Sequence, residues 1–72
     1  MTVIPKMKRE EVLRVRLGLL RREHSDLDTA IHALEATPAP DMLAIRRMKK
    51  KKLSLKEAIV RLEDEITPDI IA

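Results

Sequence analysis

Two histidines and an aspartate recur at four-residue intervals in the first half of the chain, at His24, Asp28 and His32. Imidazole nitrogens and carboxylate oxygens are ligands that zinc and related divalent metals accept in proteins. On a helix, each four-residue step drifts by about 40°, so only adjacent members of this series can easily share one ion. We therefore predict no metal site. We expect His24 to pack as a neutral imidazole, Asp28 to face a lysine on another helix, and His32 to be solvated.

The densest charged segment is a basic run that could contact a phosphate backbone, consisting of Arg46, Arg47, Lys49, Lys50 and Lys51. Phosphate contacts from Lys and Arg supply most non-specific affinity for nucleic acid. The chain has no aromatic residue, however, and aromatic rings are the usual platforms on which unpaired bases stack. Consecutive lysines also point around most of a helix rather than along one stripe. We favour a solvated helix face and keep nucleic acid, an acidic protein and a lipid surface as alternatives.

Residues suited to catalysis are few. The two serines, Ser25 and Ser54, lie in no motif with a base and an orienting acid, and a single glycine cannot form a phosphate-cradling loop. The chain has no cysteine, which excludes disulfides and thiolate chemistry and is typical of a reducing compartment. No segment is apolar over the length of a membrane span. The sequence predicts a cytoplasmic protein that is not an enzyme and has neither a cofactor nor a small-molecule substrate.

The elements that position these side chains are predicted to be helices. The 72-residue chain is 44% hydrophobic, with no aromatic residue, no Asn or Gln, and one glycine, a composition that favours long helices over sheets. Spacings of four and three residues alternate along both halves, which is the heptad pattern of a helix-helix seam. His24 and Lys52 fill one gap in each half. The predicted seam consists of Leu13, Leu17, Leu20, His24, Leu27, Ile31 and Leu34 in the first half, and of Ile45, Met48, Lys52, Leu55, Ile59, Leu62 and Ile66 in the second.

Prolines set the boundaries of a single domain. We predict a first helix over about residues 6–36, a proline-containing loop at 37–40, a second helix over about 41–66, and a short tail at 67–72. Asp41 can cap the second helix through its carboxylate, and Pro68 stops it. A loop this short makes the two helices antiparallel. The predicted fold class is therefore all-α, an antiparallel two-helix coiled-coil hairpin.

Charge supports the same fold. Residues 1–22 and 42–56 are net basic, whereas residues 23–41 and 57–72 are net acidic, so folding at the loop sets opposite charges side by side at both ends. A parallel arrangement would oppose like charges. The aligned seams predict flanking pairs, each contributing about 0.2–1 kcal/mol, between Arg21 and Glu63, Asp28 and Lys56, and Glu35 and Lys49. The stem of Lys52 can cover Leu27 while its ammonium reaches Asp28.

Several aliphatic residues lie off the seam, and a two-helix hairpin buries each helix on one side only. These residues are Val12, Val15, Leu19, Leu53 and Val60, and the termini add Val3-Ile4 and Ile70-Ile71. Gly18 lies among them and either admits a neighbouring backbone or is a tolerated helix glycine. We expect these residues to form contacts between hairpins, so that the protein is a homo-oligomer, a helical bundle of hairpins.

Two stretches resemble one known family when they are taken together. Residues Glu23 to Ile31 and Met48 to Ile59 carry the resemblance, above all through His24, Leu27, Asp28 and Ile31 with Lys52, Leu53, Leu55, Lys56 and Ile59. Over about residues 20–66 the chain resembles the YdcH-like family of small bacterial proteins. Met48 stands where this family usually has Leu, and Glu57-Ala58 where Asp-Glu is common. The resemblance implies a helical hairpin and no established biochemical activity.

Our leading interpretation is a noncatalytic, self-associating hairpin that acts as an interaction or adaptor module, with a protein partner that the sequence does not identify. The alternative is a basic protein that binds the phosphate backbone of nucleic acid through Arg46 to Lys52.

Overall fold

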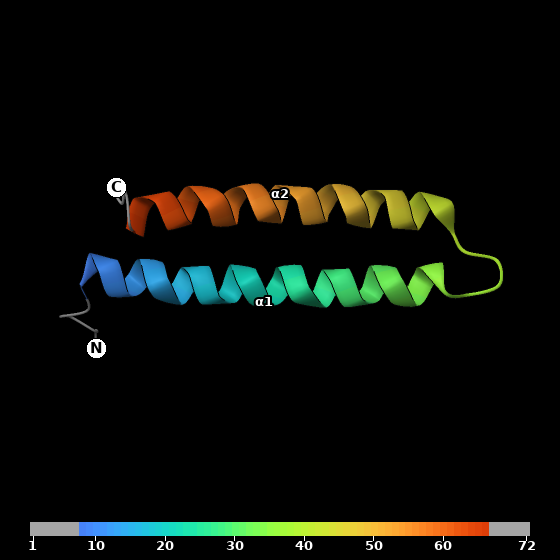
Figure 1. The fold of residues 1–72 in the computed structure, drawn as a ribbon, viewed down its shortest axis with the longest axis horizontal. Coiled ribbons are helices and arrows are strands. Elements are labelled where there is room, and N and C mark those ends of the chain that lie inside the picture. Colours follow the sequence, from blue (N-terminus) through green and yellow to red (C-terminus); the bar gives the residue numbers. More distant parts are fainter. Residues whose placement is uncertain (1–7, 67–72) are drawn as a thin grey trace, which may run out of the picture.

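The computed structural model describes residues 8–66, which form two helices and no strand. The helices are α1 (Arg9–Glu35) and α2 (Met42–Ile66). Figure 1 shows them side by side and antiparallel, joined at one end by a short loop. The predicted all-α hairpin is therefore confirmed. Within the described residues, neither helix includes a stretch that is long and apolar enough to cross a membrane.

The start of α1 is fixed by local hydrogen bonding rather than by the seam pattern. The helix begins at Arg9, not at about residue 6, because Lys8 is extended with φ −72° and ψ 152°. The Lys8 N–H donates a hydrogen bond to Glu11 Oε1 at 3.2 Å. Glu10 and Glu11 lie in the first turn, where carboxylates stabilise the positive end of the helix dipole. Residues 6 and 7 lie outside the described part of the chain.

The loop between the helices is closed by hydrogen bonds at both of its ends. The Thr37 hydroxyl donates to the Leu34 carbonyl at 2.8 Å, which satisfies a free carbonyl at the end of α1. The Ala44 N–H donates to Asp41 Oδ1 at 3.1 Å, so Asp41 caps α2 as predicted. α2 ends at Ile66. The predicted tail 67–72, the role of Pro68, and the terminal Val3-Ile4 and Ile70-Ile71 lie outside the described residues.

The structure places all fourteen predicted seam residues in buried or half-buried positions. Near the open end of the hairpin the core consists of Leu13, Leu17, Ile59 and Leu62, with Leu20 and Ile66 packed against it. Near the loop, Ile31 and Ile45 are each only 2% exposed. Between these two apolar parts lie His24, Leu27, Lys52 and Leu55, which are all half-buried. The seam is therefore divided by a polar middle section.

Candidate functional site

Ion pairs between the helices line one flank of the seam. Arg21 Nη2 lies 2.6 Å from Glu63 Oε2, and Lys49 Nζ lies 3.0 Å from Glu35 Oε2. Both pairs were predicted and are confirmed. Between them, Lys52 Nζ donates to Asp28 Oδ1 at 2.6 Å. The predicted pairing of Asp28 with Lys56 is wrong, because the Lys52 ammonium leaves the seam on this flank and binds the Asp28 carboxylate instead. The separate prediction that the Lys52 ammonium reaches Asp28 is confirmed.

The Lys52 to Asp28 contact is the most enclosed of these ion pairs. The side chain of Lys52 is 33% exposed and that of Asp28 is 40% exposed. The hydrogen bond from Lys52 is the main reason that the pKa of the Asp28 carboxyl is lowered from its ordinary value. Partial burial of the carboxyl raises its pKa, and the positive charges of Lys52, His32 and His24 lower it further. Asp28 therefore stays ionised at neutral pH and holds the lysine at the edge of the seam.

The three residues that could have held a metal do not act together. His24 is half-buried in the seam, whereas His32 is exposed, with its Nδ1 3.8 Å from Asp28 Oδ2. One carboxylate oxygen of Asp28 is engaged by Lys52. Over residues 8–66 no group of three or more His, Asp or Glu side chains is arranged to hold a metal ion.

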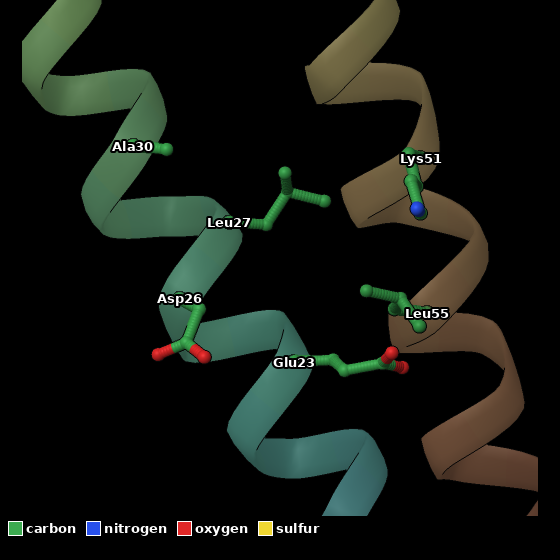
Figure 2. A pocket seen from close by; sticks show the side chains of 6 residues that line it. All are labelled: Glu23, Asp26, Leu27, Ala30, Lys51 and Leu55. Carbon is green, nitrogen blue, oxygen red and sulfur yellow. The ribbon is translucent and has the colours of Figure 1, made fainter.

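The other flank of the seam has the Arg9 to Glu65 contact of 3.7 Å near the open end and a hollow in its middle. The hollow has a volume of about 200 Å³, opens to solvent, and is lined by Glu23, Asp26, Leu27, Ala30, Lys51 and Leu55. Figure 2 shows Leu27 and Leu55 pointing towards one another between the helices, with Glu23 reaching towards α2 and Asp26 turned away from it. A second hollow of about 360 Å³ lies at the open end, beside Arg9, Leu13 and Glu65. Sequence reasoning missed both hollows. The small side chain of Ala30 at the edge of the seam was the available signal for the first.

The basic run is accessible but is partly neutralised by the chain itself. All five residues predicted to contact phosphate are exposed. Lys49 is held by Glu35. Arg46, Arg47, Lys50 and Lys51 form no ion pair within residues 8–66. At 100° per residue, these four cations lie within an arc of about 140° on the side of α2 that faces away from the seam.

The five off-seam aliphatic residues are all exposed: Val12 by 42%, Val15 by 54%, Leu19 by 60%, Leu53 by 58% and Val60 by 45%. They form two separate patches. Leu53 and Val60 are three or four residues from Lys49, Lys56 and Glu63, so they border the ion-pair flank. Val12 and Leu19 are similarly spaced from Arg16 and Glu23, so they border the flank with the hollow.

Two further exposed apolar side chains, Met42 at 61% and Leu43 at 62%, lie in the first turn of α2. Sequence reasoning missed them. The signal was present, because both precede Ile45 at positions that the heptad seam does not use.

These features define a small helical-hairpin protein. It has a divided seam, a flank of ion pairs, an open hollow and exposed aliphatic patches. Residues 19–63, well over half of the chain, match the sequence model of a family described as protein of unknown function, DUF465. The chain belongs to this family, the YdcH-like family of small helical proteins that the sequence resembled. No curated protein and no solved structure gives a match to the chain.

Proposed function

We propose that the protein is a noncatalytic interaction module that associates with further copies of itself through aliphatic side chains on the outside of the hairpin. The observation that carries this proposal is the exposure of Val12, Val15, Leu19, Leu53 and Val60 on the outside of the two helices. Exposed apolar side chains that gather in patches are typical of protein interaction surfaces. Within this proposal the protein acts in the cytoplasm and has no catalytic role.

The small hydrophobic core of the hairpin supports self-association. Six hydrophobic residues are buried in residues 8–66, and none of the large side chains there is less than 2% exposed. Small domains are marginal because they bury little surface, and oligomerisation is a common remedy. Both hollows open to solvent, whereas most active sites lie in enclosed clefts, which favours a binding role over catalysis.

Sedimentation equilibrium of the full chain over a range of micromolar concentrations tests the proposal. We expect an apparent mass that rises with concentration above that of one 8.3 kDa chain. A strict monomer throughout this range would overturn self-association. Circular dichroism of the same samples separates a folded monomer from an unfolded chain.

A second candidate function, binding of a nucleic-acid backbone, is favoured by the exposed Arg46, Arg47 and Lys50, which form no ion pair within residues 8–66. Affinity for duplex DNA should fall steeply with salt and weaken in Arg46→Glu and Arg47→Glu. Arg61→Glu is the matched control, since Arg61 is another exposed α2 arginine and has no ion pair among the described residues. No binding at low salt, or equal losses in the control, would contradict this function.

A further inference from the structure

An apolar stripe runs along the outer side of α1. Val12, Val15 and Leu19 follow one another at spacings of three and four residues and are 42%, 54% and 60% exposed. At 100° per residue, Val15 lies nearly opposite the seam residues Leu13 and Leu17. The stripe therefore faces away from α2 and is not covered within residues 8–66.

Two complementary charges border this stripe. Arg16 directly follows Val15, and Glu23 lies seven residues further along, two turns away on the same side of the helix. Both side chains are exposed, and neither forms an ion pair within the described part of the chain. By contrast, Arg21 and Glu35, which lie on the ion-pair flank of the same helix, both have partners on α2. Glu23 lies on the flank with the hollow and reaches towards α2 (Figure 2), so its carboxylate must turn outwards to meet a charge on a second copy.

We propose that the occupant of this stripe is the same stripe of a second copy of the chain, packed α1 against α1 in antiparallel orientation about a two-fold axis. This inference rests on the proposed self-association and names its interface. In a two-fold interface each contact occurs twice, so one chain must carry both halves of every pair. The Arg16 and Glu23 side chains satisfy this requirement.

The hairpin itself shows the geometry that such a pairing uses. Arg21 and Glu63 each directly follow a seam residue, Leu20 and Leu62, in an antiparallel helix pair. If Val15 and Leu19 act as seam residues in a second antiparallel pair, Val15 of one copy faces Leu19 of the other. This arrangement then brings Arg16, which follows Val15, to Glu23 of the second copy, and the two-fold axis repeats both contacts.

The register also explains why the pairing is antiparallel. In this arrangement Arg22 lies against Val12 of the second copy, and its hydrocarbon stem can cover that valine while the guanidinium stays in water. A parallel pairing through the same stripe would place the two Arg22 side chains against one another. Like charges at such a position destabilise a helix pair.

Charge exchange tests the interface in the full chain. We expect Arg16→Glu and Glu23→Arg each to raise the dimer dissociation constant about tenfold, because two symmetry-related pairs are lost, and the double exchange to restore it. Lys50 and Glu57 provide a matched control, because both are exposed on α2, neither has an ion pair in the part of the chain that the structure describes, and they have the same spacing of seven residues. Circular dichroism checks that each variant keeps its helices.

The outcomes distinguish this interface from the broader proposal. Loss in both single variants, rescue in the double variant and no effect at Lys50 or Glu57 would support it. An oligomer that is indifferent to Arg16 and Glu23 would overturn the interface while leaving self-association intact. A wild-type chain that is monomeric would overturn both.

Crosslinking tests the orientation independently. The chain has no cysteine, so Val15→Cys and Leu19→Cys each introduce the sole thiol. When the two variants are mixed and gently oxidised, the antiparallel register predicts that the mixed disulfide forms faster than either homodimer, as read by mass spectrometry. Preferential formation of the two homodimers would indicate a parallel pairing and overturn the proposed one.

Discussion

Lys52 occupies a seam position yet donates its hydrogen bond sideways to Asp28, with Nζ 2.6 Å from Oδ1. Its stem therefore takes the place of an aliphatic side chain between the helices, while its charge is satisfied at the edge. The two ions are partly exposed, so neither is fully desolvated. Polar residues at seam positions commonly specify register and orientation at some cost in stability.

Because a lysine in the seam lowers the stability of the hairpin, we expect Lys52→Leu to raise the free energy of unfolding by about 1 kcal/mol. The new side chain adds apolar contact in the half-buried middle of the seam. Urea unfolding followed by circular dichroism measures this change. Lys50→Leu, at an exposed position of the same helix, should change the free energy of unfolding by less than about 0.5 kcal/mol. A destabilised Lys52→Leu would show that the ion pair outweighs the apolar contact.

The lowered pKa of Asp28 predicts a pH dependence of stability. Because the carboxyl pKa is lower in the folded chain than in the unfolded one, its contribution is fully present above the unfolded value of about 3.9. The contribution is lost as pH falls through the lower folded value. Thermal unfolding of wild type and Asp28→Asn should therefore differ at neutral pH, and the difference should shrink as pH falls through the folded value. A constant difference across this range would contradict the assignment.

The apolar part of the seam nearest the loop should be sensitive to loss of volume. Ile31 and Ile45 are each 2% exposed, so Ile31→Ala and Ile45→Ala should each lower the free energy of unfolding by about 2–5 kcal/mol. In so thin a hairpin that loss should be visible as reduced helix content at room temperature. Leu43→Ala, in the same helix as Ile45 but 62% exposed, serves as the control and should retain wild-type helicity.

Gly18 should be replaceable by alanine with a gain in stability. Its φ is not positive, and a Cβ added there would meet no atom of residues 8–66 within 4 Å beyond its own stretch of helix. Gly18→Ala should therefore stabilise α1 by about 1 kcal/mol, which is the difference in helix propensity. The reverse change at an exposed position of the same helix, Ala33→Gly, should destabilise it by a similar amount. Melting temperatures at low concentration compare the two, and a destabilised Gly18→Ala would reveal a contact that needs the glycine.

The features predicted from the sequence are those that periodicity and local chemistry determine. The seam follows from alternating spacings, the Asp41 cap from a carboxylate before a helix, and the Arg21 to Glu63 pair from the resulting register. The sequence left two lysines competing for Asp28, because the choice depends on the direction in which the flexible Lys52 stem leaves the seam. The start of α1 was misplaced because the seam pattern does not show that Lys8 is extended.

The sequence contained enough information to separate the exposed aliphatic residues into two patches, but we treated them as one set. Helical spacing alone relates Leu19 to Arg16 and Glu23, and Leu53 to Lys49 and Lys56. Only the observed pairing shows which of these charges lie on the ion-pair flank and which border the hollow. The hollow itself depends on how far Leu27 and Leu55 reach across the seam, which the sequence does not specify.

Arg9 and Glu65 approach to 3.7 Å at the end of the hairpin opposite the loop, so the first turn of α1 and the last turn of α2 lie together. A pulling force applied to these two ends would act across the seam rather than along it. The helices would then separate progressively, one layer of seam residues after another, from Leu13 towards the loop. The divided core should make this rupture occur in two steps, first through the Leu17 and Leu62 cluster and then, past the polar middle, at Ile31 and Ile45.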